Sequence, residues 1–383
     1  MKLLARCAVI AAAAGLVFGP ASLAAAASPS GPPDQPPHPQ PQSVFVQTNN
    51  PAGNQVIVFA QQPNGQLSQE QVVSTGGLGA ASAGASNLAS EGSLTYDPAH
   101  HLLFAVNAGS DTISVLSVDG VNVRLDEVLR SQGEFPNSIA VHGNLVYVVN
   151  AAGAGSVSGF YIFGQFVVPI PGSTRSLGLD NTNPPGIHTS PGQVGFSPNG
   201  SELVVTTKQS TNAIDAFRVG PFGLLSTTPT VNPDGSNAPF AFAWTPSGQL
   251  VVAELGPDAL HTFSLGPDTT LTSLSGSVSD GQSALCWVIA AGGYYYAANA
   301  GSGDLSSYTI APDGTPSLLA AVAATTGAGQ IDPTVSANGR YLYAESGVGG
   351  GTVFEFGINS DGSLSPLGSV TGLGANMEGI AAG

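Results

Sequence analysis

Residues 146–160 read VYVVNAAGAGSVSGF, and this stretch contains the pattern that decides the fold. A run of mostly β-branched residues ends in asparagine, a glycine-rich turn follows, and a second short run mixes serine with apolar residues. β-Branched and aromatic residues favour strands, and glycine favours the tight turns between them. The stretch therefore predicts two antiparallel strands joined by a short turn.

The same pattern recurs along the chain. Clear copies are LFAVN at 103–107 and YYAAN at 295–299, and weaker copies end at residues 48, 207, 254 and 346. Successive copies end 43 to 59 residues apart, which suits a four-stranded propeller blade with variable loops. Another strand and a tight turn, such as SPNG at 197–200, precede most copies. We therefore expect an all-β, seven-bladed β-propeller of four-stranded antiparallel blades over residues 43–383.

The two ends of this repeat region complement each other. The first unit begins at Val44 without its preceding strand, and residues 377–382 look like that missing strand. Pairing the C-terminal strand into the first blade would close the ring and protect its sheet edges. The alternatives are an open β-solenoid or two stacked sandwiches, although a solenoid would have shorter and more regular coils.

The N-terminus has the features of an export signal. Lys2 and Arg6 precede an apolar run at 8–18, and small residues follow at 24–27. This pattern predicts a signal peptide over 1–27, cleaved near Ala27. Residues 28–42 hold seven prolines and predict a stiff linker. We expect a bacterial protein that is secreted, extracellular or associated with the cell wall, with no membrane span after cleavage.

Composition excludes several classes of protein. The chain has 51 glycines and 29 prolines among 383 residues, with 42% hydrophobic residues and 8% charged ones, so neither disorder nor a coiled coil fits. The net charge of -16 argues against nucleic acid as a partner. Cys286 is the single cysteine after the predicted signal peptide, which excludes an intrachain disulfide. No metal-ligand spacing is present, so we expect no metal and no cofactor, and a closed ring predicts a monomer.

The repeats SPNGSELVV (197–205), TPSGQLVVAEL (245–255) and SANGRYLYAES (336–346) resemble those of a known family. This is the seven-bladed propeller lactonase family, which includes 6-phosphogluconolactonase and carboxymuconate lactonizing enzymes. The resemblance covers the whole expected mature chain. It implies a propeller that hydrolyses or forms a lactone ring at the mouth of its central channel.

The resemblance nominates Glu254 as a catalytic residue, and the positions of Lys208 and His188 in this chain add two further candidates. Glu254 ends a strand similar to one that ends in Asn-Glu-Leu in the family, where the glutamate belongs to the proposed catalytic cluster; here it would be the acid or base, or else a solvated strand-end acid. Lys208 ends the equivalent strand one blade earlier, and adjacent blades could bring the two to one mouth; alternatively it is a solubilising surface lysine. His188 lies in a proline-rich loop and is either a helper base or an exposed histidine. The family's arginine and histidine positions hold Phe240 and Gln193 here, so the family reaction does not transfer directly.

Other polar residues are candidates for substrate binding. Gln193 can donate a hydrogen bond to a carbonyl or carboxylate. Asn107, Asn150 and Asn299 recur at one position of the repeat, where they either cap the following turn or form a ring of amides that binds a sugar. Glu345 lies near an inner strand and is a further candidate.

Two functional hypotheses follow. The first is a secreted lactonase-like enzyme, a hydrolase or a lactonizing cyclase, whose partner is a small lactone or a carboxylated or sugar ligand. The few cations of the chain argue against a phosphorylated substrate. The second is a non-catalytic surface propeller, because the runs at 104–107 and 147–150 resemble the Tyr-Val-Thr-Asn repeats of bacterial surface propellers. Missing histidine and arginine favour the second hypothesis, whereas Glu254 and Lys208 favour the first.

Overall fold

The structure is a computed structural model that describes residues 42–80, 88–235 and 237–383. The chain divides into the parts 1–39 and 40–383, and the propeller belongs to the second. The predicted signal peptide and residues 28–41 of the predicted linker lie outside the described residues. Within the described ranges, no helix is long and apolar enough to cross a membrane.

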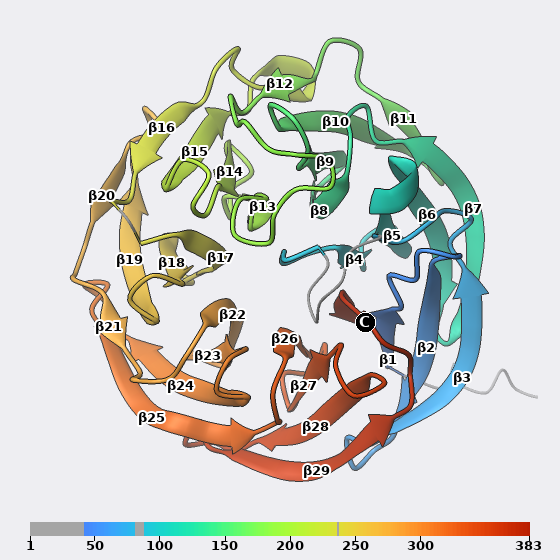
Figure 1. Ribbon diagram of the computed structural model, residues 1–383, viewed down its shortest axis with the longest axis vertical. Coiled ribbons are helices and arrows are strands. Elements are labelled where there is room, and N and C mark those ends of the chain that lie inside the picture. The colour runs from blue at the N-terminus through green and yellow to red at the C-terminus, as the bar shows by residue number, and fades with distance from the viewer. Residues whose placement is uncertain (1–41, 81–87, 236) are drawn as a thin grey trace, which may run out of the picture. The chain divides into compact units, whose positions relative to one another are not determined.

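Seven antiparallel sheets surround a central axis (Figure 1). The expected seven-bladed propeller is therefore confirmed. The first three blades contain, from the inside outward, the following strands: β30 (Ile380–Ala382), β1 (Ser43–Gln47), β2 (Gln55–Gln61) and β3 (Leu67–Ser74); β4 (Leu94–Asp97), β5 (Leu102–Asn107), β6 (Thr112–Asp119) and β7 (Asn122–Arg130); β8 (Pro136–His142), β9 (Leu145–Asn150) and β10 (Ser156–Phe163), which pairs with both β11 (Phe166–Pro169) and β12 (Arg175–Ser176).

The other four blades follow the same order. Their strands are β13 (Gln193–Phe196), β14 (Glu202–Thr206), β15 (Ala213–Arg218) and β16 (Thr230–Pro233); β17 (Pro239–Trp244), β18 (Gln249–Glu254) and β19 (Ala259–Leu265), which pairs with β20 (Leu271–Ser273) and β21 (Val278–Ser279); β22 (Leu285–Ala291), β23 (Tyr294–Asn299), β24 (Asp304–Ile310) and β25 (Pro316–Thr325); β26 (Gln330–Val335), β27 (Tyr341–Ser346), β28 (Thr352–Ile358) and β29 (Leu364–Thr371). Two short 3-10 turns, η1 (Ala108–Ser110) and η2 (Pro221–Gly223), complete the described elements.

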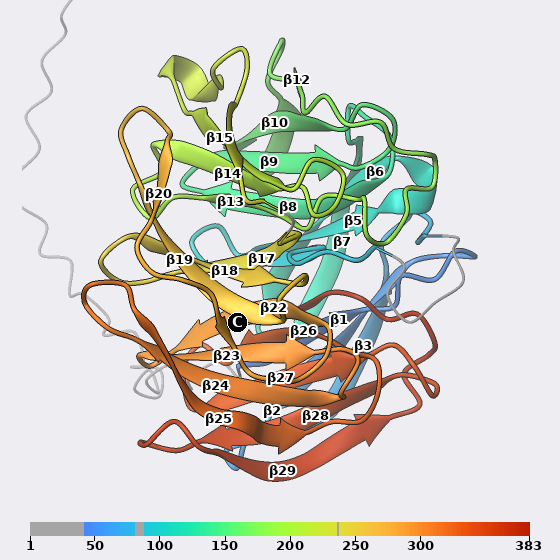
Figure 2. The same ribbon diagram turned by 60° about the vertical axis from the view of Figure 1, so that its left-hand side comes forward.

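The core lies between the blades, which Figure 2 shows stacked side by side. Strands are buried on both faces, so alternate residues of one strand pack against opposite neighbours. In β2, Val56 and Val58 pack toward the second blade, whereas Ile57 and Phe59 pack toward the seventh. This explains the near-continuous apolar runs of the repeat.

The ring closes as the ends of the sequence predict. β30 pairs antiparallel with β1, with Val46 opposite Ile380 and Val44 opposite Ala382. Backbone hydrogen bonds from Ser43 N to Gly383 O and from Gly383 N to Ser43 O, 3.1 and 2.8 Å long, extend the ladder. The first blade thus takes its innermost strand from the C-terminus, and no solenoid or sandwich forms.

Candidate functional site

Glu254 is fully buried at the end of β18 and accepts three hydrogen bonds. Its Oε1 accepts from Nδ2 of Asn237 (3.2 Å) and lies 2.6 Å from Nδ1 of His261, while its Oε2 accepts from the hydroxyl of Ser277 (2.5 Å). Burial of a carboxylate costs free energy unless hydrogen bonds replace its water. These contacts replace it, so Glu254 is a held, oriented acid rather than a solvated one.

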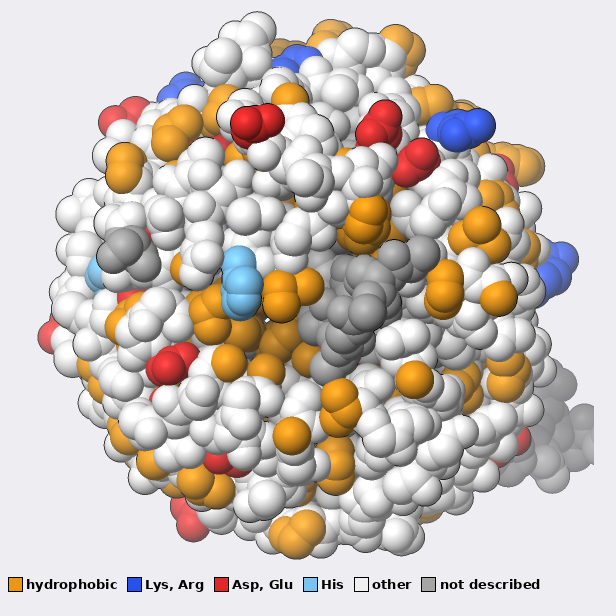
Figure 3. All heavy atoms as spheres, viewed as in Figure 1, with side chains coloured by type: hydrophobic (Ala, Val, Ile, Leu, Met, Phe, Trp, Pro, Cys, Tyr) orange, Lys and Arg blue, Asp and Glu red, His pale blue; other side chains and the backbone are white. Residues whose placement is uncertain are grey.

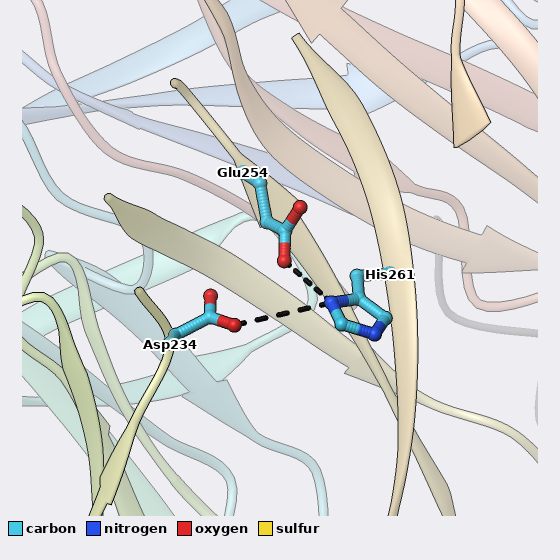
Figure 4. A group of neighbouring side chains, drawn as sticks. All are labelled: Asp234, Glu254 and His261. Atoms are coloured by element: carbon cyan, nitrogen blue, oxygen red, sulfur yellow. Dashed lines mark hydrogen bonds and ion pairs between the residues drawn. The ribbon is translucent and has the colours of Figure 1, made fainter. Parts of the chain in front are cut away.

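His261 joins Glu254 to a second acid. The register of β18 and β19 pairs Val252 with His261, which places Glu254 and His261 on one face of the sheet. Asp234, which follows β16 of the preceding blade, has its Oδ1 3.9 Å from Nδ1 of the same imidazole. Figure 4 shows both carboxyl groups directed at the His261 ring.

The electrostatics of this group favour a charged imidazole. Burial by itself lowers the pKa of His261, but the hydrogen bond to Glu254 and the charges of Glu254 and Asp234 outweigh it, so the pKa is raised. Burial, and then the nearby Glu254, raise the pKa of Asp234 to about 7. The group therefore holds exchangeable protons near neutral pH, as acid–base chemistry requires.

The other ring nitrogen of His261 faces outward. Nε2 lies 2.7 Å from Oγ of Ser273, an exposed residue at the end of β20. A chain of contacts thus runs from the buried Glu254 through His261 to a surface hydroxyl. The Ser273 hydroxyl also donates to Ser275 O (2.6 Å). When this hydroxyl turns from that carbonyl to Nε2, the hydroxyl, the imidazole and the oriented carboxylate form the arrangement that activates a serine for attack on an ester.

The same residues have the dimensions of a cation site. Asp234, Glu254 and His261 each offer one ligand atom, and these atoms lie within 4.8 Å of one another. Carboxylate and imidazole ligands suit a divalent metal. A metal would compete for the His261 Nδ1 and Glu254 Oε1 atoms that now contact each other.

The Lys208 ammonium has its own set of contacts, which does not include the Glu254 carboxylate. The ammonium is buried and donates to Ala89 O (2.7 Å), Ile187 O (2.6 Å) and the Ser190 hydroxyl (2.8 Å). It also lies 4.6 Å from the ring centroid of Phe240, which was expected at the family's arginine position. The side-chain contacts of Lys208 and Glu254 share no residue, but both backbones meet Pro239: Lys208 N donates to Pro239 O (3.2 Å), and Pro239 pairs with Glu254 between β17 and β18.

The other predicted site residues are spread over the ring. His188 is exposed, and its carbonyl accepts from Gln209 N (3.0 Å). Gln193 is half-buried at the start of β13, and its Oε1 accepts from Phe242 N (2.6 Å). Neither contacts the group around Glu254.

The three recurrent asparagines are buried and donate within their own blades, and Oδ1 of Asn107 also accepts from Asn54 Nδ2 (3.0 Å) and Thr75 Oγ1 (2.7 Å) of the first blade. In each, Nδ2 donates to a serine of the next strand outward: Ser114 for Asn107 (2.8 Å), Ser158 for Asn150 (3.4 Å) and Ser306 for Asn299 (2.8 Å). These contacts support the turn-stabilising interpretation. A shared ligand-binding ring would require the side-chain amides of all three asparagines to face the same cavity.

Glu345 supports the closing strand. It is fully buried, and its Oε1 accepts from Gly379 N (2.6 Å), one residue before β30. Burial, together with the charges of Glu378 and Glu91, raises its pKa well above that of an ordinary glutamate.

Comparisons with known proteins establish the fold. No protein-family model matches the sequence, and no curated protein is similar to it. Solved structures do match: a protein of Bacteroides uniformis proposed to be a 6-phosphogluconolactonase (17% identity, 90% of this chain and 99% of that chain, TM-score 0.68) and the periplasmic gluconolactonase PpgL of Pseudomonas aeruginosa (16%, 88% and 98%, TM-score 0.68). A virginiamycin B lyase of Staphylococcus aureus, with quinupristin, matches less closely (13%, 71% and 82%, TM-score 0.51). The predicted resemblance to lactonase propellers is thus confirmed at the level of architecture.

Sequence reasoning missed His261, Asp234 and Ser273. His261 follows Glu254 by seven residues, and a hairpin centred between them would have placed the two side chains together. Asp234 and Ser273 carry no such signal, because their positions depend on how neighbouring strands and blades pack.

Proposed function

We propose that this chain is an exported, monomeric, lactonase-like propeller in which Glu254 acts through His261. The observation that carries the proposal is the chain of contacts from Ser273 Oγ to His261 (2.7 Å) and from His261 to Glu254 (2.6 Å). Structural similarity to lactonase propellers supports the choice of a cyclic ester as substrate. Lactones are esters, and serine, histidine and a carboxylate are a recurrent solution for ester hydrolysis.

In the proposed reaction, Ser273 Oγ attacks the lactone carbonyl carbon while its proton passes to Nε2 of His261. The ring C–O bond then breaks, and the ring oxygen takes that proton from Nε2. Water attacks the acyl-serine with His261 again as base, which releases the hydroxy acid and restores the serine. Glu254 holds Nδ1–H and stabilises the imidazolium that forms at each step.

The test is hydrolysis of a panel of uncharged and carboxylated lactones by the secreted protein. We expect Ser273→Ala and His261→Ala each to lower kcat/KM by about 100-fold or more. Combining the two should cost little more than either alone, because residues that act as a unit are not additive. Ser279→Ala, at an exposed serine of the same blade, is the matched control and should retain full activity.

Full activity in Ser273→Ala would contradict the assignment of the nucleophile. Absence of hydrolysis across the panel would contradict the enzymatic proposal itself.

The pH profile gives an independent check. His261 must be neutral to accept a proton, so kcat/KM should rise with pH through its raised pKa. Asp234→Asn removes a charge that raises this pKa, so the midpoint should move to lower pH. A midpoint that stays in place would show that Asp234 does not act on His261.

A second candidate is a non-catalytic binding propeller. Lys208 is already occupied by three acceptors, and Phe240 replaces a cation, so the positions inherited from the family offer no free positive group. Inactivity on every lactone, together with a correctly folded protein, would favour this candidate.

A further inference from the structure

The central channel contains a second candidate site, which shares no residue with the group around Glu254. A cavity of about 440 Å3 follows the inner strands β4, β8, β13, β17 and β30, touches β26 at Thr334, and reaches the last residues of β8, β13 and β17. Its lining includes Glu91, Gln193 and Trp244, and it excludes Glu254, His261 and Ser273. This volume lies within the range of about 300–1,000 Å3 typical of small-molecule sites.

Aromatic side chains line one side of the cavity. Tyr96, Phe242 and Trp244 belong to its wall, and the rings of Phe242 and Trp244 meet edge to face with centroids 6.2 Å apart. Nε1 of Trp244 is buried and donates to no residue of the described part of the chain. A buried donor without an acceptor requires an explanation, and a bound hydroxyl group would supply one.

Polar groups lie beside these rings. The Oε1 of Gln193 is taken by Phe242 N (2.6 Å), which leaves its NH2 group as the donor for a ligand. Glu91 is a further polar residue of the lining.

The charges of the cavity limit its ligand. The lining residues include no lysine or arginine and a single histidine, His142, so a carboxylate or phosphate would find little countercharge. Burial raises the pKa of Glu91 to about 7, which weakens Glu91 as a partner for an ammonium group. A neutral ligand with several hydroxyl groups needs neither a positive nor a negative partner, so it suits this cavity.

On the face shown in Figure 3, apolar side chains and one histidine border a hollow near the middle.

We propose that the channel cavity binds a neutral sugar, one pyranose ring packed on the aromatic wall and its hydroxyl groups bonded to Gln193 and Glu91. Aromatic rings present an apolar face to the C–H groups of a sugar, while amide and carboxyl groups recognise its hydroxyls. This inference does not depend on the proposed lactonase activity, because the two sites share no side chain.

Tryptophan fluorescence provides the test. The chain has only two tryptophans; Trp287 is 2% exposed in the core, whereas Trp244 lines the cavity. D-Glucose, D-galactose, D-mannose and D-xylose should be titrated separately into the secreted protein. We expect a saturable emission change with at least one of them, and Trp244→Phe should abolish that change.

Calorimetry with the sugar that responds identifies the polar contacts. Gln193→Ala and Glu91→Gln should each weaken binding by about tenfold, which corresponds to about 1.4 kcal/mol. Gln249→Ala, a glutamine outside the cavity, is the matched control and should bind as the original protein does. Circular dichroism establishes whether each variant is folded, and Gln193→Ala remains informative should Trp244→Phe fail to fold.

Saturable binding of a neutral sugar that depends on Gln193 supports the proposal. Failure of all four sugars to bind at about 50 mM would overturn it, since a Kd weaker than this corresponds to less than about 2 kcal/mol of binding free energy. Tighter binding of D-glucuronate or choline than of any neutral sugar would overturn it as well.

Discussion

At the scale of single residues, Lys208 shows how a buried charge is accommodated. Three oxygen acceptors surround its ammonium and the Phe240 ring lies beneath it, yet burial still lowers its pKa to about 7. The unfolded chain, where the pKa is near 10.5, therefore binds more protons than the folded protein between pH 7 and 10.5. The contribution of Lys208 to the free energy of unfolding therefore rises with pH between 7 and 10.5. This contribution is lost as the pH falls to 7.

Lys208→Met removes this dependence. Relative to the variant, the original protein should gain on the order of 1–3 kcal/mol of unfolding free energy between pH 7 and pH 9.5. The measurement is urea denaturation at both pH values, with Arg130→Met at an exposed position as control. Parallel pH profiles for the original protein and Lys208→Met would show that the lysine does not titrate in this window.

The candidate site was only partly predictable from the sequence. Glu254 could be found because a carboxylate that ends an apolar strand stands out in the sequence and matches a family motif. Lys208 carries the same local signal, but its partners Ala89, Ile187 and Ser190 come from loops whose paths the repeat does not encode. His261 contributes to the site through cross-strand register, which depends on the exact length of the hairpin.

At the scale of elements, the aromatic position of the repeat joins neighbouring blades. Tyr147, Tyr296 and Tyr343 each lie three residues before the end of the second strand of their blade. Their hydroxyls donate to the carbonyls of Gly223, Gly362 and Gly65, at 2.7, 2.8 and 2.8 Å, in turns of the following blade. The tyrosines are fully buried, so each bond is made where water cannot replace it.

Tyr296→Phe should therefore destabilise the protein by about 1–2 kcal/mol, because it removes the donor and leaves the Gly362 carbonyl without it. Chemical denaturation measures the change. Tyr161→Phe, at a 40% exposed tyrosine, is the control and should change stability by less than about 0.5 kcal/mol. Equal effects of the two substitutions would contradict a role for the hydroxyl in joining blades.

At the scale of the whole molecule, the repeat predicted the number of blades and the way in which the ring closes. Both follow from the periodic burial of apolar residues, and this period is visible in the sequence itself. Two details did not follow. The strands β1 and β14 end at Gln47 and Thr206, one residue before the predicted positions. The extra strands β12 and β21 pair within their blades after the short connections 170–174 and 274–277. Such details depend on turn geometry rather than on hydrophobic pattern.

Closure of the ring can be tested with a disulfide across its seam. Ser43 and Gly383 exchange both backbone hydrogen bonds, so the adjacent pair, Val44 and Ala382, is non-hydrogen-bonded. Side chains of such pairs lie closest together in antiparallel sheets. Val44→Cys combined with Ala382→Cys should form a disulfide that raises the unfolding free energy of the oxidised protein above that of the reduced protein, by about 2–5 kcal/mol.

Cys286 does not compete for this disulfide, because it is buried and burial raises the pKa of its thiol to about 12. Free thiol counting and thermal unfolding with and without reductant measure bond formation and its effect. Val44→Cys alone controls for the cost of the substitution at a fully buried position. Since the two cysteines are far apart in the sequence, rapid and complete oxidation to a monomer requires the C-terminal strand to lie against β1. Three free thiols under oxidising conditions, namely the two introduced ones and that of Cys286, or dimers linked between chains, would mean that the ring is open in solution.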